Sequence, residues 1–300
     1  MVVTREAANL SRLQLVQSGP QLNPNLTDAE CPHVWSLCAL PDGVLLLACG
    51  EVGLRAVSLN RTQLLAHEPT TIRNVYRVAY DVHTDKLFLI VEDLNLKHFQ
   101  LATLRRNTSN VNKWIEEKRI STDIFKSDRP IVAVCKSRIL LAKEGVINTL
   151  YLFNVSAEQT LSAEDSVNVT SEMGDSYIYR LACVRRDDDK LVAFSHWDSV
   201  SLYRLIRKSL QLKLEKIDRV ELSAPVELVF RGDLLLVKHR DRTFNISSFR
   251  ASGSGLTEER VLLAAVVDVD AWTLAGDKLV LWNQYTKNLL AYVFEYSNEQ

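Results

Sequence analysis

The chain repeats one pattern of polar and hydrophobic positions six times: a short polar turn leads directly into a run of aliphatic residues. The first site is Pro41-Asp42-Gly43 followed by residues 44–47, and the last is Gly276-Asp277-Lys278 followed by residues 279–281. Successive repeats begin 43, 52, 52, 43 and 45 residues apart, counted from the first aliphatic residue: Val44, Leu87, Ile139, Leu191, Leu234 and Leu279. A period in this range with strand-like repeats predicts the blades of a β-propeller.

Each repeat has much the same internal order. An apolar strand precedes the turn, and a third strand ending in polar residues follows the aliphatic run, as in residues 33–59. The aliphatic run itself is almost uninterrupted, which is typical of a strand buried on both faces between neighbouring blades. Only two segments, residues 111–119 and 257–262, are candidates for short helical turns. The fold is therefore predicted to be all-β.

The two ends of the sequence complement each other. The last repeat, residues 265–296, contains only three strands, while residues 12–18 alternate like a strand but precede the first repeat. The simplest closure pairs this N-terminal strand with the last blade and removes two exposed strand edges. We predict a single domain over residues 1–300 with six blades, or seven if a degenerate repeat lies within a 52-residue step.

Composition and charge narrow the range of functions. Hydrophobic residues make up 47% of the chain and charged residues 24%, which is typical of a folded, soluble protein. The formal net charge of -1 gives no overall attraction to nucleic acid or to an anionic membrane. No apolar run approaches the about 20 residues needed to span a bilayer, and residues 1–9 lack the pattern of a signal peptide.

Cysteines and asparagines point to different compartments. The odd number of cysteines, mostly within apolar runs, predicts reduced, buried thiols and an intracellular protein, cytoplasmic or nuclear: Cys31, Cys38, Cys49, Cys135 and Cys183. Seven Asn-x-Ser/Thr sequons would be glycan acceptors in a secreted protein: Asn9, Asn25, Asn60, Asn107, Asn154, Asn168 and Asn245. Secretion is therefore the alternative if the chain is an excised ectodomain.

Through its six turn-and-aliphatic sites, the chain resembles degenerate members of the WD40-like and YVTN-like propeller superfamily over nearly its whole length. It lacks their Gly-His and Trp-Asp dipeptides in the usual places, since Trp197-Asp198 falls in the wrong part of its repeat. The resemblance implies a rigid disc whose loops bind other macromolecules, most often as a scaffold without a cofactor.

On this basis we expect a non-enzymatic module that binds a protein or peptide partner at the rim of the central channel. Aromatic and arginine side chains are common in the energetically dominant parts of such interfaces. The inner strands supply the candidate binding residues: Trp35, Tyr76, Arg77, Tyr179, Arg180, Glu227 and Asp270. Trp272 belongs with them, although Trp35 and Trp272 also have the pattern of core residues.

Two other functions stay open. Lactonase-type hydrolases with six blades hold Ca²⁺ in the channel with oxygen ligands, for which the chain offers Asn74, Glu227, Asp268 and Asp270. The same carboxylates would otherwise neutralise Arg77 and Arg180. A nucleic-acid face would use Tyr203 with the neighbouring basic residues Arg204, Arg207 and Lys208. Ser195-His196-Trp197-Asp198 is predicted to be a turn beside a packed tryptophan, because adjacent residues cannot form a catalytic relay.

Overall fold

A computed structural model describes most of the chain. The described residues are 12–18, 23–60, 63–65, 68–95, 98–110, 112–120, 130–134, 138–143, 145–146, 149–154, 166–168, 177–186, 189–208, 211–240, 243–266 and 269–297. Within these ranges the chain forms strands and turns and contains no helix. No helix in this described part is therefore long and apolar enough to cross a membrane.

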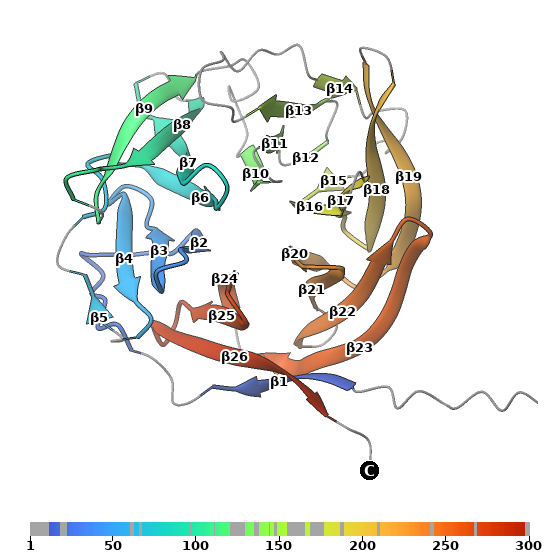
Figure 1. Cartoon of the computed structure of the whole chain (residues 1–300). Coiled ribbons are helices and arrows are strands. Elements are labelled where there is room, and N and C mark those ends of the chain that lie inside the picture. Colours follow the sequence, from blue (N-terminus) through green and yellow to red (C-terminus); the bar gives the residue numbers. More distant parts are fainter. Residues whose placement is uncertain are drawn as a thin grey trace, which may run out of the picture.

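The strands form six antiparallel four-stranded sheets around a central axis, with the strand that opens each repeat innermost (Figure 1). Blade 1 consists of β2 (Ser36–Ala39), β3 (Val44–Ala48), β4 (Leu54–Ser58) and β5 (Gln63–Leu64). Blade 2 consists of β6 (Val75–Asp81), β7 (Lys86–Asp93), β8 (His98–Arg106) and β9 (Trp114–Ile120). Blade 3 consists of β10 (Pro130–Val134), β11 (Arg138–Lys143), β13 (Thr149–Asn154) and β14 (Ser166–Asn168).

The second half of the ring follows the same plan. Blade 4 consists of β16 (Arg180–Arg186), β17 (Asp189–Ser195), β18 (Ser199–Lys208) and β19 (Gln211–Glu221). Blade 5 consists of β20 (Pro225–Arg231), β21 (Leu234–Arg240), β22 (Phe244–Ser252) and β23 (Gly255–Val266). Blade 6 consists of β24 (Val269–Ala275), β25 (Lys278–Asn283), β26 (Asn288–Ser297) and β1 (Arg12–Gln17). A two-stranded pair, β12 (Gly145–Val146) and β15 (Tyr177–Ile178), joins the segments that follow β11 and precede β16.

Strand β1 closes the ring as predicted. It pairs antiparallel with β26 from Arg12 opposite Ser297 to Gln17 opposite Tyr292, and the Ser18 amide donates to the Ala291 carbonyl at 2.7 Å. In Figure 1 this strand lies along the outer side of β26. The prediction of a six-bladed propeller closed by its N-terminal strand is confirmed, and the option of a seventh blade is dropped.

The hydrophobic core is divided among the six gaps between neighbouring blades. The buried apolar residues of the described chain form six clusters, each shared by two adjacent blades. In β3, the second strand of blade 1, alternate side chains point into two different gaps. Leu46 packs toward blade 2, whereas Leu45 and Leu47 pack against Val280 and Trp282 of blade 6. This double burial is the physical reason for the uninterrupted aliphatic runs in the sequence.

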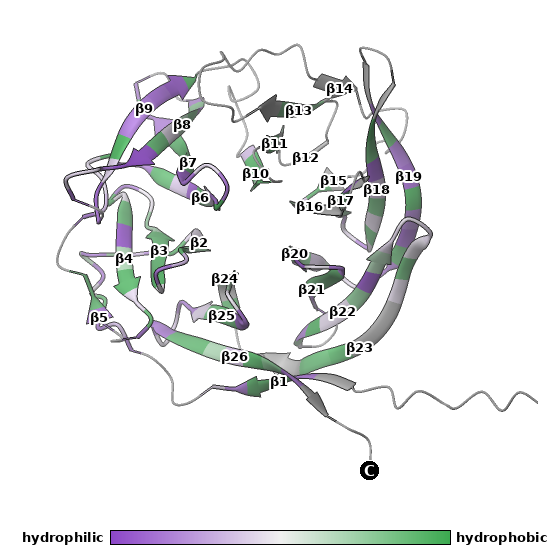
Figure 2. Ribbon diagram, in the orientation of Figure 1, coloured by the Kyte–Doolittle hydropathy of each residue, from purple (hydrophilic) through white to green (hydrophobic). Residues whose placement is uncertain are grey.

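Both segments considered for helical turns are strands. Residues 111–119 overlap β9 and residues 257–262 lie within β23, each the outermost strand of its blade. An outermost strand meets a neighbour along one edge only, so β9 buries Trp114 and is otherwise largely exposed and hydrophilic (Figure 2). Bulges in the pairing of both strands also interrupt the alternation by two, which made the pattern resemble a helix.

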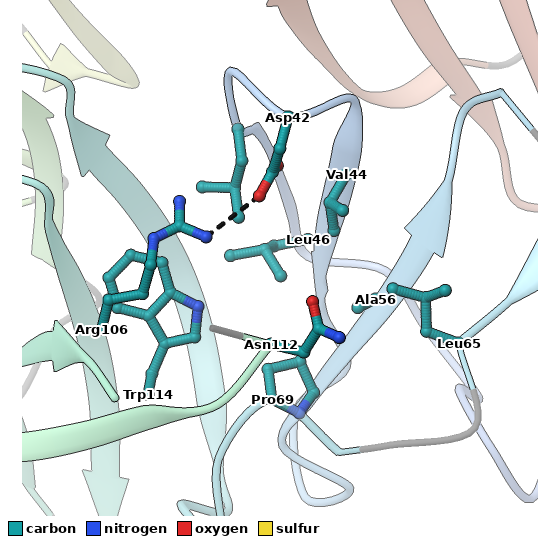
Figure 3. Close-up of a pocket in the computed structure, with 10 residues that line it drawn as sticks. Asp42, Val44, Leu46, Ala56, Leu65, Pro69, Arg106, Asn112 and Trp114 are labelled. Carbon is teal, nitrogen blue, oxygen red and sulfur yellow. Dashed lines mark hydrogen bonds and ion pairs between the residues drawn. The ribbon is translucent and has the colours of Figure 1, made fainter. Parts of the chain in front are cut away.

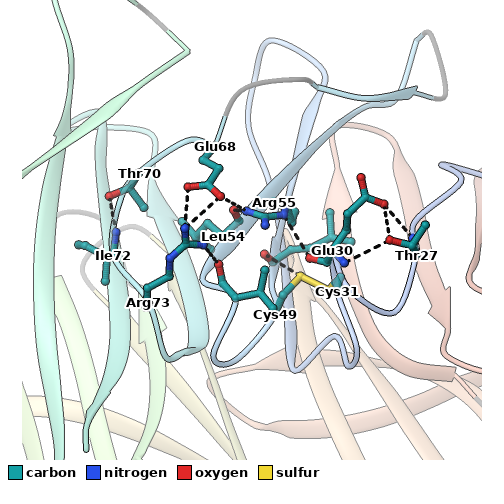
Figure 4. A network of polar contacts seen from close by, with 12 residues as sticks. Thr27, Glu30, Cys31, Cys49, Leu54, Arg55, Glu68, Thr70, Ile72 and Arg73 are labelled. Carbon is teal, nitrogen blue, oxygen red and sulfur yellow. Dashed lines mark hydrogen bonds and ion pairs between the residues drawn. A yellow bond between two sulfur atoms is a disulfide. The ribbon is translucent and has the colours of Figure 1, made fainter.

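The expectation that all cysteines are reduced is wrong for one pair. Cys31 and Cys49, both buried, form a disulfide with their Cα atoms 5.1 Å apart (Figure 4). It joins the connector between β1 and β2 to the end of β3. Cys38 is a buried thiol outside any disulfide, and burial raises the pKa of this thiol to about 12, which keeps it protonated.

Polar contacts hold the same connector in place (Figure 4). The Glu30 carboxylate accepts hydrogen bonds from the Thr27 amide and hydroxyl, each at 2.9 Å, and these bonds lower the pKa of Glu30. The Arg55 guanidinium donates to the Glu30 carbonyl at 3.1 Å and forms an ion pair with Glu68 at 3.1 Å. Arg73 contacts the same Glu68 carboxylate at 3.1 Å. The connector is thus held by the disulfide and by hydrogen bonds, and Arg55 links it to Glu68 in the segment between blades 1 and 2.

Removing the disulfide should destabilise the whole ring, because it closes a loop with a sequence separation of 18 residues. We expect the double variant Cys31→Ser, Cys49→Ser to lose about 3 kcal/mol in free energy of unfolding, measured by urea denaturation under non-reducing conditions. Reducing agent should weaken the natural protein and leave this variant unchanged. Equal urea midpoints for the two proteins would contradict the prediction.

Candidate binding surface at the channel rim

The inner strands of all six blades line a cavity of about 180 Å³ at the central channel. Its lining includes one or more residues from each blade, among them Trp35, Arg77, Ile131, Arg180, Glu227 and Trp272. Four predicted site residues, Trp35, Arg77, Arg180 and Glu227, are therefore brought together here although they come from four different blades and from positions up to 192 apart. Asp270 lies in β24, but its side chain is outside the described part of the structure.

Within the channel, the predicted charges pair with each other. The Arg180 guanidinium contacts the Glu227 carboxylate at 2.7 Å, and the two side chains are only 22% and 19% exposed. Arg180 also donates to the Tyr179 carbonyl at 2.7 Å, and Arg77 donates to the Trp35 carbonyl at 2.6 Å. Charge-assisted hydrogen bonds of this kind fix the backbone next to the aromatic residues. The arginines therefore act as supports of the rim.

This pairing bears directly on the calcium hypothesis. A guanidinium in contact with Glu227 repels a cation and occupies the carboxylate that would bind it. Asn74 does not line the channel cavity, but a separate depression that also contains Glu92 and Asp93. Asp268 is outside the described residues. Among the residues that the structure does describe, no three His, Cys, Asp or Glu side chains form a group able to hold a metal.

Aromatic rings extend outward from the channel in edge-to-face contacts. The ring centroids of His33 and Trp35 are 4.5 Å apart, those of Trp35 and Tyr76 5.2 Å, and those of Tyr76 and Phe99 5.6 Å. On the other side of the ring, Tyr179 lies 6.2 Å from Trp197. The edge-to-face arrangement of the first three pairs is a preferred geometry for aromatic rings. The contact between Trp35 and Tyr76 joins blade 1 to blade 2.

All these aromatics lie on one face of the disc. In a four-stranded meander, the start of the first strand and the turn between the second and third strands fall on the same side. We call this side the rim face. It carries Trp35 and Tyr76 at the starts of inner strands, and Trp197 in the turn between β17 and β18.

Large apolar side chains protrude from this face at three alternate blades. Leu94, Trp197 and Tyr285 occupy the second-to-third-strand turns of blades 2, 4 and 6, and they are 59%, 70% and 81% exposed. Leu94 and Tyr285 were not among the predicted site residues, and the prediction that Trp197 is packed is wrong. The available signal was a large apolar residue between two polar residues within a turn, as in Asp93-Leu94-Asn95.

Trp35 and Trp272 differ in burial. Trp272 is 7% exposed and packs in the cluster between blades 5 and 6, as expected for a core residue. Trp35 is half-buried. Its ring packs against Tyr76, and it also forms part of the rim face. The sequence could not separate them, since both belong to the inner-strand segments of their repeats.

The proposed base-stacking patch does not form as expected. Tyr203 is 1% exposed and packs against Phe194, with ring centroids 5.5 Å apart, so its ring cannot stack on a base. Arg204 donates to the Gly253 carbonyl at 3.2 Å and lies 3.6 Å from Glu215. The side chains of Arg207 and Lys208 are outside the described part of the structure.

No family model and no curated protein matches the chain. Solved structures do resemble it over nearly its whole length. A chain in the crystal structure of the mitotic checkpoint complex matches with a TM-score of 0.54 and 11% identity, covering 99% of this chain and 95% of that one. A PQQ-bound aldose sugar dehydrogenase from Streptomyces coelicolor matches with a TM-score of 0.61 and 10% identity, covering 96% of this chain and 100% of that one. A putative 6-phosphogluconolactonase from Bacteroides fragilis matches with a TM-score of 0.59 and 12% identity, covering 96% of this chain and 92% of that one.

At these identities the likeness is one of fold alone. It confirms the β-propeller architecture and does not point to a specific family.

Proposed function

We propose that the chain is a non-enzymatic interaction module that binds a protein or peptide partner on its rim face. The observation that carries the proposal is the trio Leu94, Trp197 and Tyr285, which expose large apolar side chains around the channel. Large apolar residues on the surface of a protein are typical of interaction sites when they gather on one face. Tryptophan and tyrosine are also the residues that contribute most to protein interfaces.

Hydrogen bonds hold the turns of Tyr285 and Trp197 in place. The Gln284 side chain, next to Tyr285, accepts from the Val34 amide at 3.1 Å and from the Trp282 indole at 2.9 Å, and it donates to the Pro32 carbonyl at 2.7 Å. The turn of Trp197 is tied to the next blade, because the Ala224 amide donates to the Trp197 carbonyl at 3.1 Å. A preorganised surface loses little conformational entropy when a partner binds.

Charges around the trio are balanced within the chain. Asp198, next to Trp197, forms an ion pair with Arg219 at 3.0 Å, and the Ser199 hydroxyl donates to it and lowers its pKa. Near Tyr285, Lys287 forms an ion pair with Asp28. Paired charges provide polar surroundings and leave the apolar side chains to supply most of the affinity. The partner surface that fits is therefore mainly apolar at its centre.

The enzymatic alternative stays an untested prediction. Two of the similar structures are described as a sugar dehydrogenase and a putative lactonase, but these are statements about those proteins. For this chain, the contact between Arg180 and Glu227 speaks against a cation in the channel. The scaffold is the function that the described side chains support best.

Replacing the trio should abolish partner binding without unfolding the protein. The triple variant Leu94→Ser, Trp197→Ser, Tyr285→Ser removes side chains that are mostly exposed, so its melting temperature should stay close to that of the natural protein. Each replacement at an interface centre typically weakens binding by about tenfold or more. We expect partners captured from the source cells by the natural protein to be lost with this variant.

The matched control is Val82→Ser, a 61% exposed residue in the first-to-second-strand turn of blade 2, on the opposite face. It should capture the same partners as the natural protein. Unchanged capture by the triple variant would refute the rim-face proposal. A melting temperature of the natural protein that rises on adding calcium would favour the metal-dependent hydrolase instead.

We also infer an oxidising, secretory compartment in place of the intracellular one expected from the sequence. The basis for the earlier expectation was reduced thiols, and Cys31 and Cys49 form a disulfide. Such bonds persist mainly in oxidising compartments. The sequon asparagines Asn25 and Asn60 are exposed, and the Asn107 side chain accepts from the Ser109 amide at 2.8 Å in an open turn. Asn9 is outside the described residues.

Protein purified from its own cells should carry glycans at the exposed sequons. Treatment with peptide-N-glycosidase in heavy-oxygen water should convert Asn25 and Asn60 to labelled Asp, detected by mass spectrometry of peptides. Asn245 should remain unlabelled, because it lies within β22 and its sequon Ser247 is buried and hydrogen-bonded to His239 at 2.8 Å. Unlabelled Asn25 and Asn60 together with free thiols at Cys31 and Cys49 would contradict this location.

A further inference from the structure

A second cavity, of about 230 Å³, lies in the seam between blades 1 and 2 (Figure 3). Asp42 comes from the first-to-second-strand turn of blade 1, whereas Arg106, Asn112 and Trp114 come from the third-to-fourth-strand connection of blade 2. In an antiparallel meander these connections fall on the face opposite the rim face. The cavity, which we call the seam pocket, is therefore separate from the surface discussed above.

The walls of the seam pocket are mainly apolar. Leu46 and Ala56 are 1% and 4% exposed and form its buried base, and Trp114 supplies one side. The remaining apolar lining consists of Leu40, Val44, Leu65 and Pro69. Pockets that hold small metabolites usually measure about 300–1,000 Å³, so this one is better matched to a single large apolar side chain.

The mouth of the pocket carries an excess of negative charge. Arg106 forms ion pairs with Asp42 at 3.0 Å and with Asp85 at 3.1 Å, and its guanidinium lies 4.7 Å from the centroid of Trp114. The arginine side chain is 20% exposed, whereas those of Asp42 and Asp85 are 44% and 50% exposed. Two exposed carboxylates against one covered guanidinium favour a cation and disfavour an anion at this position.

We propose that the seam pocket receives one large apolar side chain of a peptide segment whose neighbouring residue is lysine or arginine. The apolar side chain would lie on Leu46 and Ala56, and the basic group would contact the open sides of Asp42 and Asp85. The amide of Asn112, which faces the pocket in Figure 3, is placed to hydrogen-bond the peptide backbone. An apolar anchor in a pocket with charges at its edge is a common mode of peptide recognition.

Three capped tripeptides test the proposal with the full chain. The probe is acetyl-Arg-Leu-Arg-amide, in which a basic residue flanks leucine on both sides. One control replaces both arginines by glutamate, and the other replaces leucine by serine. Binding is followed by the NMR signal of the Trp114 indole. We expect a saturable shift with the probe and at least about tenfold weaker binding of each control, a difference of about 1.4 kcal/mol.

Two variants connect the binding to this pocket. Ala56→Leu fills the base and should abolish the shift, while Asp42→Asn, a substitution at a half-exposed site that should not affect folding, should weaken binding of the probe severalfold. Trp197→Ser, on the rim face, is the matched control and should bind normally. Equal binding of all three peptides, absence of saturation, or full binding by Asp42→Asn would overturn the proposal. So would self-association of the chain that Ala56→Leu removes, because a second copy would then occupy the pocket.

Discussion

The structure depends on the pairing of the first strand of the chain with the last. Every blade buries both sides of its second strand against neighbouring blades, so no blade can bury its apolar surface alone. In an open array, blades 1 and 6 would each expose one such surface. The pairing of β1 with β26 anchors the start of the chain on blade 6, and the following segment leads directly into blade 1. That link brings Leu45 and Leu47 against Val280 and Trp282.

Closure also orders the rim face, on which we propose that a partner binds. The connector from β1 to β2 is held by the disulfide between Cys31 and Cys49 and by Gln284, whose side chain contacts the connector and adjoins Tyr285. The contacts that close the ring therefore also order one of the three exposed side chains. In the channel, the pairing of Arg180 with Glu227 makes a similar support between blades 4 and 5. Contacts between blades thus supply both the rigidity of the ring and the order of the proposed binding surface.

Much of the architecture could be predicted from the sequence because it depends on local patterning. Turns such as Pro41-Asp42-Gly43 before aliphatic runs reveal the number of blades, and the missing fourth strand of the last repeat reveals the closure. Outermost strands were harder to identify, since β9 is solvent-exposed on much of its surface and lacks a clear alternation. The disulfide was missed because Cys31 and Cys49 meet only after the connector folds back on β3.

The site was less predictable, because exposure depends on contacts between distant segments. The inner strands were found correctly, and with them Arg180 and Glu227. The ion pair of these two residues agrees with the alternative that channel carboxylates neutralise the arginines, although sequence alone could not show which residues pair. Trp197 was expected to be packed because tryptophan is usually buried, whereas its turn leaves it exposed. The seam pocket combines residues from two blades, Asp42 and Arg106, that lie 64 positions apart, and no local pattern marks it.

Amide hydrogen exchange of the full chain, followed by NMR, tests the closure most directly. If β1 is an integral strand of blade 6, its amides that donate to β26 should exchange slowly, at the same rate as the protected amides of β26. The two strands would then open as one cooperative unit. Exchange of all amides in residues 12–17 at the rate of an unfolded chain, while β26 and β25 stay protected, would contradict the account.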